Sequence, residues 1–96
     1  MMISITEQVF TRIEEILFVH GIANNVANID KKGTGIFIVD YNLRHGGRAK
    51  ITLEITPHDG ALWGHFLNLL QVAGTNTSKP HEDSASDIRP LWFPLS

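Results

Sequence analysis

Residues 35–56, GIFIVDYNLRHGGRAKITLEIT, decide the predicted fold. Apolar and polar residues alternate on both sides of Gly46-Gly47, a pattern typical of two half-buried β-strands joined by a tight turn. A three-residue loop, His45-Gly46-Gly47, pairs Arg44 with Arg48 and keeps similar residues opposite one another. Glycine supplies the positive φ that such a loop needs. The sequence therefore predicts an antiparallel hairpin with one apolar and one polar face.

The two faces of this hairpin differ in chemistry. The polar face carries Asp40, Lys50 and Glu54, together with Ile36 and Ile38, so we expect it to be exposed to solvent or used for association. The other face carries larger apolar residues, which a helix can cover: Phe37, Val39, Tyr41, Ile51, Leu53 and Ile55.

The residues before the hairpin have helical periodicity. Ser4 and Glu7 have the spacing of a capping box, and Gly21 is suited to the end of a helix. Phe18 lies outside the apolar stripe, and it is interpreted either as an exposed aromatic or as a partner contact. The stripe comprises Ile5, Val9, Ile13, Ile16, Leu17 and His20.

Between this helix and the hairpin, residues 25–30 (NVANID) form either a short first strand or a loop. Residues 30–33 (DKKG) have turn chemistry and would lead into the hairpin. With the strand included, the sequence predicts a three-stranded antiparallel meander.

A second helix is predicted after the hairpin. Pro57 is expected to end the preceding strand, Asp59 is a natural N-cap, and Gly74 ends the apolar pattern. The helical stripe comprises Leu62, Trp63, Phe66, Leu67, Leu69, Leu70 and Ala73. The predicted fold is thus α+β, in the order helix, three strands, helix (α-β-β-β-α), over residues 1–74.

Residues 75–96 are predicted to be a polar linker followed by an apolar tail. Residues 75–87 show no periodicity, whereas the chain turns abruptly apolar at residues 88–95. Two hypotheses for Leu91, Trp92 and Phe93 remain open: they complete the core of their own domain, or they dock into another molecule.

Composition excludes several classes of function. The chain has 96 residues, a net charge of −2 and no cysteine, which rules out disulfides, thiolate catalysis and cysteine-based zinc sites. The five histidines show no metal motif, and no catalytic residues and no cofactor are predicted. Without a basic leader or a long apolar run, the chain is expected to be cytoplasmic, with no membrane partner.

By elimination, the leading prediction is a small non-enzymatic protein-binding domain, such as an inhibitor or accessory factor of the phage or mobile-element type. We expect aromatic and apolar side chains to contact the protein partner: Leu91, Trp92, Phe93, Phe18, Ile36 and Ile38.

Two alternatives remain. Arg44, Arg48 and Lys50 concentrate positive charge around the hairpin loop, where guanidinium groups and backbone N–H groups could bind phosphate, so nucleic-acid binding is the second hypothesis. The third is a self-associating subunit, for example a homodimer, with the tail or the second helix as its interface.

Overall fold

In a computed structural model, residues 4–44, 46–71, 88 and 91–96 are described. These residues form one helix and five strands in the order α1 (Glu7–Val19), β1 (Ala23–Gly33), β2 (Ile36–Leu43), β3 (Arg48–His58), β4 (Ala61–Gln71) and β5 (Trp92–Pro94).

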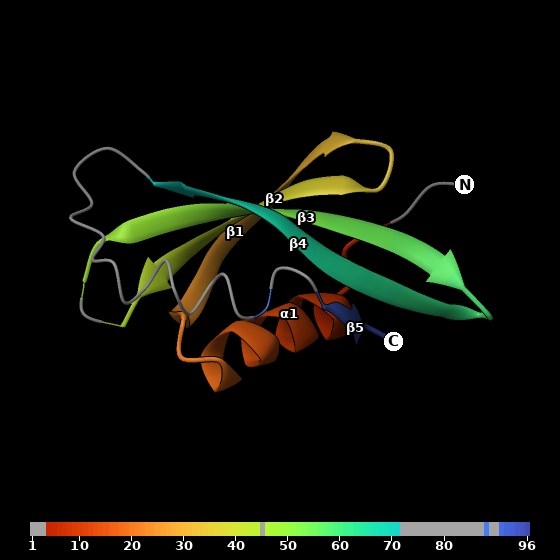
Figure 1. Cartoon of the computed structure of the whole chain (residues 1–96), viewed down its shortest axis with the longest axis horizontal. Coiled ribbons are helices and arrows are strands. Elements are labelled where there is room, and N and C mark those ends of the chain that lie inside the picture. Colours follow the sequence, from red (N-terminus) through yellow and green to blue (C-terminus); the bar gives the residue numbers. More distant parts are fainter. Residues whose placement is uncertain (1–3, 45, 72–87, 89–90) are drawn as a thin grey trace.

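The strands form a single antiparallel sheet in the order β1-β2-β3-β4-β5, and α1 lies across one face of it (Figure 1). The described fold is therefore mostly β. The predicted α-β-β-β-α arrangement with three strands is wrong, because the segment predicted as the second helix is strand β4.

A two-residue turn at Asp59-Gly60 accounts for this difference. Both residues have positive φ, 51° and 81°, and the flanking His58 and Ala61 are paired. Positive φ at both central positions is typical of the type I′ turn, which favours Asp-Gly and matches the twist of antiparallel strands. Asp59 consequently connects two strands, and the predicted helix N-cap at this residue is wrong.

Pro57 also lies within a strand, contrary to the prediction that it ends one. Two residues earlier, the Ile55 N–H donates to the Gly35 carbonyl at 2.8 Å, beside the first residue of β2. Alternate residues of a strand point their N–H groups in the same direction. The nitrogen of Pro57 therefore also faces the β2 side of β3, but Pro57 lies past the end of β2. No backbone hydrogen bond is lost there, although proline has no N–H to donate.

The predicted β2–β3 hairpin is present, but its register differs by two residues. Asn42 pairs with Arg48, and the Leu43 N–H donates to the Gly47 carbonyl at 3.0 Å, so the loop begins one residue earlier than predicted. Because a shift of two residues keeps every side chain on its face, the predicted apolar face is correct. Its six residues are at most 2% exposed and face α1: Phe37, Val39, Tyr41, Ile51, Leu53 and Ile55.

Strand β1 is longer than residues 25–30 and includes the predicted turn at residues 30–33. The chain reverses instead at Thr34-Gly35, where Gly35 has a φ of 71°. Three irregularities interrupt the register of β1 with β2. The Val26 N–H donates to Glu14 Oε2 of α1 at 2.9 Å, so the helix satisfies one backbone group of this edge strand.

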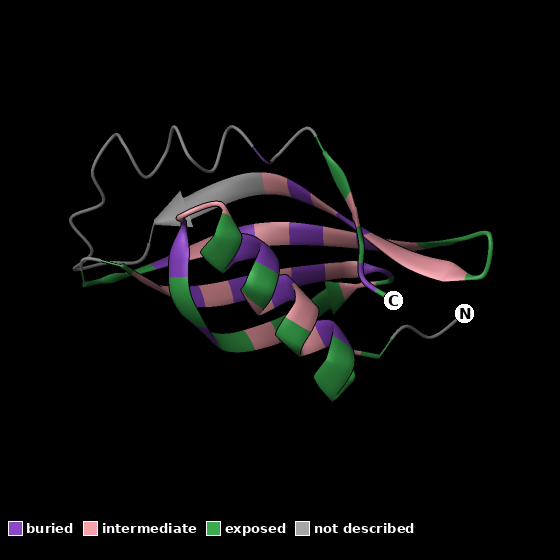
Figure 2. Ribbon diagram, turned by 90° about the horizontal axis from the view of Figure 1, so that it is seen from below, coloured by how far each residue is buried: buried purple, intermediate pink, exposed green. Residues whose placement is uncertain are grey.

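Helix α1 has the predicted buried stripe, with Val9, Ile13, Ile16 and Leu17 in the core. Thr6, rather than Ser4, is the N-cap, since its Oγ1 accepts from the Val9 N–H at 3.2 Å. At the other end, hydrogen bonds from Gly21 and Ile22 close a Schellman motif, which confirms the predicted stop at Gly21. Figure 2 shows the purple, buried side of α1 turned toward the sheet.

The described part of the carboxy-terminal tail packs on its own sheet. Strand β5 pairs with β4, and the Leu95 N–H donates to the Leu62 carbonyl at 2.7 Å. Ile88 and Leu95 are buried in the same core as α1, and Arg12 Nε donates to the Pro94 carbonyl at 3.0 Å. The predicted domain boundary at residue 74 and the linker over residues 75–87 lie outside the described residues.

Candidate functional site

The predicted contact residues of the tail fall on two different sides of the sheet. Phe93 pairs with Gly64 and packs toward the core, with its ring 6.1 Å from that of Phe66. Trp92 is directed to the opposite side and is 44% exposed, and Leu91 beside it is 47% exposed. Trp92 and Leu91 are thus available to a partner, whereas Phe93 stabilises the fold.

The register of β3, β4 and β5 places Trp92 on the face of the sheet opposite α1, which we call the open face. Thr56 is paired with Trp63, and His65 with Trp92. Directly paired residues share a face, as do residues two apart in a strand. Because Gly64 and Phe66 of β4 point into the core, Trp63, His65 and Trp92 lie together on the open face.

A groove of about 570 Å³ lies on this face near the β3–β4 turn. We call it the tryptophan groove; it is lined by Thr56, Pro57, His58, Asp59, Trp63 and Trp92. Both tryptophans of the chain line it. Its volume falls within the range of about 300–1,000 Å³ that is typical of small-ligand sites.

His65 fixes the position of the Trp92 indole. The two rings are stacked, with centroids 4.7 Å apart and planes inclined by 19°. His65 Nδ1 also lies 3.1 Å from the Leu91 carbonyl oxygen, which ties the ring to the chain just before β5. The indole is therefore held in place by neighbouring groups before any ligand binds.

Asp59 carries the formal negative charge of the tryptophan groove. Its side chain is 89% exposed, and His58 Nε2 lies 3.3 Å from Asp59 Oδ2. The two positive φ angles of the turn hold Asp59 at the tip of the hairpin, next to the aromatic lining. The groove thus combines a flat apolar lining with a carboxylate at its end.

Trp63 was not predicted to be a site residue, because it was assigned to the buried stripe of a helix. The Asp-Gly dipeptide four residues before it could have revealed the hairpin, since Asp-Gly between apolar segments favours a two-residue turn. With that turn in place, period-2 alternation puts Trp63 on the face opposite Gly64.

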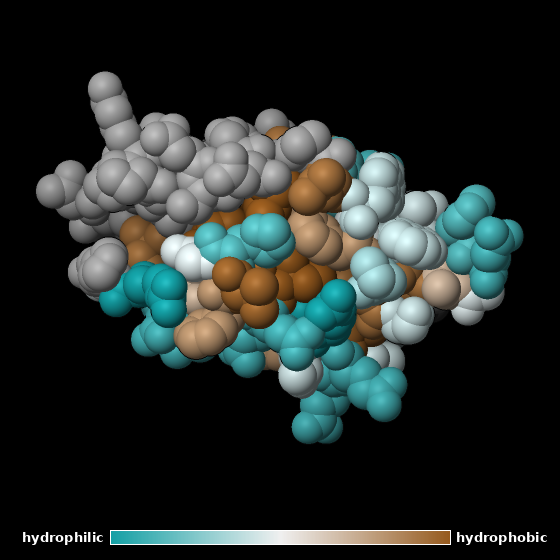
Figure 3. Space-filling model, turned by 60° about the horizontal axis from the view of Figure 1, so that its bottom comes forward, coloured by the Kyte–Doolittle hydropathy of each residue, from teal (hydrophilic) through white to brown (hydrophobic). Residues whose placement is uncertain are grey.

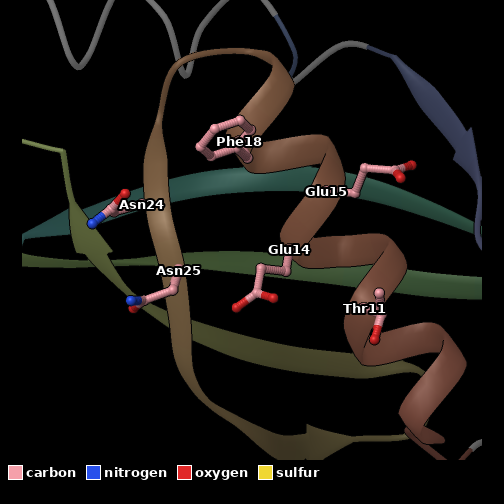
Figure 4. A pocket seen from close by; sticks show the side chains of 6 residues that line it. All are labelled: Thr11, Glu14, Glu15, Phe18, Asn24 and Asn25. Atoms are coloured by element: carbon pink, nitrogen blue, oxygen red, sulfur yellow. The ribbon is translucent and has the colours of Figure 1, made fainter.

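Phe18 lies at a second, smaller cleft, between α1 and β1. Figure 4 shows its ring near one end of this cleft, with Glu14 and Glu15 further along the helix and Asn24 and Asn25 across from it on β1. Phe18 is 49% exposed, and the guanidinium carbon of Arg44 lies 5.1 Å from its ring centroid. Figure 3 shows apolar residues (brown) reaching the surface among hydrophilic ones (teal) on this side of the molecule.

Ile36 and Ile38 lie on the open face, as predicted, and are half-buried. They are paired with Glu54 and Thr52 of β3 and lie away from the tryptophan groove. Ile36 and Ile38 thus share the open face with Trp92 but do not line the tryptophan groove, whereas Phe18 lies apart, at the cleft between α1 and β1.

The three basic residues proposed for nucleic-acid binding have different surroundings. Arg44 stacks on Phe18 at the end of α1, whereas Arg48 lies 3.9 Å from Asp40 Oδ2 and donates to the Asn42 amide oxygen at 3.4 Å. Lys50 is paired with Asp40 across the strands and is half-buried. The three cations therefore do not form one continuous basic patch, because Arg44 lies against an aromatic ring while Arg48 and Lys50 lie beside Asp40.

Within the described residues, no three histidine, aspartate or glutamate side chains converge in a way that could hold a metal ion. No described helix combines the length and the apolar character needed to cross a membrane.

Comparison with protein-family models, with curated proteins and with solved structures finds no match for this chain.

Proposed function

We propose that this chain is a non-enzymatic protein-binding domain that contacts its partner through the tryptophan groove. The observation that supports the proposal is the placement of Trp63 and Trp92 on one exposed face, beside a groove of about 570 Å³. Tryptophan is enriched among the residues that contribute most to binding free energy at protein interfaces. The cytoplasmic location expected from the sequence is part of this proposal.

The core supplies rigid support for this surface. Leu95 and Phe93 pack beneath β4, while Trp92 and Pro94 alternate with them on the open face. Because the backbone of β5 is fixed by β4 and by Arg12, the indole loses little conformational freedom on binding. A preorganised aromatic contact of this kind favours recognition over a reaction that needs positioned acids and bases.

A displayed random-peptide library selected on the purified full chain tests the proposal. We expect peptides that bind the wild-type chain and bind the Trp92→Ala variant at least about 30-fold more weakly, the loss typical of a central aromatic contact. Val19→Ala is the matched control, because Val19 is 72% exposed and lies outside the groove. Its affinity for the same peptides should equal that of the wild type.

Folding of each variant is checked by circular dichroism before its affinity is measured. Selected peptides that bind folded Trp92→Ala as tightly as the wild type would contradict the proposal. If the selected peptides instead bind Val19→Ala more weakly than the wild type, the binding site lies at the end of α1.

A further inference from the structure

The lining of the tryptophan groove restricts the chemistry of its ligand. An indole Nε1–H is a donor and has no acceptor function. Neither tryptophan N–H has a hydrogen-bond partner among the described residues. A ligand that presents acceptors to Trp63 and Trp92 would therefore gain hydrogen bonds that the described residues do not supply.

The position of the groove restricts the ligand further. It lies on a face of the sheet, where β3 and β4 already hydrogen-bond to one another through paired residues such as Thr56 and Trp63. An extended peptide lying across this face therefore cannot add a strand between β3 and β4, because strand addition requires a free sheet edge. The side chains that line the groove must therefore recognise a peptide in this position.

A polyproline II segment meets both conditions. Proline has no N–H to leave unsatisfied, and its backbone carbonyls project outward as acceptors. Its left-handed helix exists before binding, so little entropy is lost, and grooves lined by aromatic residues recognise it. An oligosaccharide carries hydroxyl groups that both donate and accept, so it is the competing ligand class that the experiment must exclude.

The carboxylate at the end of the groove restricts which residue of the ligand can lie beside it. Asp59 is the acidic residue of the lining, and its carboxylate is exposed. A carboxylate in this position favours an arginine or lysine side chain and disfavours an acidic one.

We propose that the tryptophan groove binds an extended, proline-rich segment of a partner protein that carries arginine or lysine beside its prolines. This inference rests on the proposed function and names the partner chemistry of the same site. Trp63 and Trp92 contact the proline rings and donate to backbone carbonyls, and Asp59 contacts the cation.

Three synthetic nonapeptides test this inference with the full chain. The first has eight prolines and a central arginine, the second has a central glutamate, and the third replaces its prolines with glycine but keeps the arginine. Tryptophan fluorescence reports directly on the groove, because both tryptophans line it. We expect a saturable change with the arginine–proline peptide and none with the glycine peptide.

Asp59→Asn provides the charge control. Asparagine tolerates positive φ, so the turn is retained while the carboxylate is lost. We expect the wild type to prefer the arginine over the glutamate peptide by about two- to fivefold at low salt, as for an exposed ion pair. In Asp59→Asn this preference should fall to about one, with the affinity for the glutamate peptide retained or increased.

Several results would overturn the inference. Equal binding of the glycine peptide would show that polyproline geometry is not recognised, and an unchanged arginine preference in Asp59→Asn would remove the role of the carboxylate. Peptides from the displayed library that depend on Trp92 but lack proline would overturn this inference and leave the proposed function intact. Saturation by a soluble glucose oligomer, with no binding by any peptide, would overturn both.

Discussion

The two halves of strand β3 have different neighbours. Ala49, Ile51 and Leu53 lie beneath α1 and are fully buried, whereas Thr56 to His58 extend past the helix and line the tryptophan groove. Figures 1 and 2 show the β3–β4 hairpin projecting beyond α1. The covered half supplies the core, and the projecting half supplies a surface whose position the core fixes.

One continuous strand thus contributes to stability at one end and, in the proposed function, to recognition at the other. Alternation makes it possible, because each residue that enters the core is followed by one on the open face. Substitutions along β3 and β4 can therefore separate the two roles.

Leu53→Ala should have the largest effect of the substitutions considered. Leu53 is fully buried where β2, β3 and β4 meet, so its truncation leaves a cavity and should lower the free energy of unfolding by about 2–5 kcal/mol. Urea unfolding measures this loss. Thr52→Ala, next in the chain but on the open face, should cost less than about 1 kcal/mol. Equal losses of unfolding free energy in the two variants would mean that the side chains of residues 52 and 53 are buried to the same extent.

Gly64→Ala should have the next largest effect, because it tests how closely the tail packs on β4. A Cβ at residue 64 would lie 2.7 Å from Leu95 Cδ1 and 3.2 Å from Leu53 Cδ1. We expect a loss of about 1–3 kcal/mol in urea unfolding, as for other overpacked cores.

Gly33→Ala is the control for this substitution. Nothing lies within 4 Å of a Cβ at Gly33, so stability should change little or increase by less than about 1 kcal/mol. In a helix, Gly64→Ala would instead stabilise the chain by about 1 kcal/mol. A gain in stability would thus contradict the strand assignment of β4.

Gly60→Ala tests the projecting half through its turn and should have a smaller effect than Leu53→Ala or Gly64→Ala. No atom lies within 4 Å of a Cβ at Gly60, so the cost is conformational, about 1–2 kcal/mol for a non-glycine residue at a φ of 81°. Thermal unfolding followed by circular dichroism measures it. Asp59→Asn should leave the melting temperature nearly unchanged, and a similar loss in both variants would argue against a type I′ turn.

The part of the fold that could be predicted from sequence is the part with uninterrupted alternation. In β3, and in β2 from Val39 onward, apolar and polar residues alternate, so the two faces were assigned correctly although the loop starts one residue earlier. The helix α1 was predicted for the same reason, since its apolar residues keep the helical period up to Gly21.

Strand β4 could not be recognised by its periodicity because its alternation is interrupted. Leu53 pairs with Phe66, but Ile51 pairs with Leu69, so β4 contains an extra residue between these pairs. Because of the extra residue, the apolar positions change from even-numbered to odd-numbered residues along β4. Some apolar residues are therefore three or four positions apart, which is the spacing typical of a helix. Gly64 within the supposed helix was a contrary signal, since glycine is unfavourable there.

The candidate site was predicted in part. Trp92 was identified because an aromatic residue stood in an abruptly apolar tail, and it is exposed in the structure. Trp63 and Asp59 were missed as site residues, because their meeting with Trp92 depends on β5 pairing with β4. That pairing joins segments about 30 residues apart, which no local pattern specifies.

The contact between Arg12 and Pro94 has a consequence for the time course of folding. These residues are 82 positions apart, and they join the first element of the chain to the last. Contacts between distant residues form slowly, because a long loop must close before they contribute any stability. Local pairing in the β2–β3 hairpin should thus precede the docking of β5. The tryptophan groove, which needs Trp92 in place, is then complete only after β5 has docked, so a ligand of the groove would bind only molecules whose tail has folded onto the sheet.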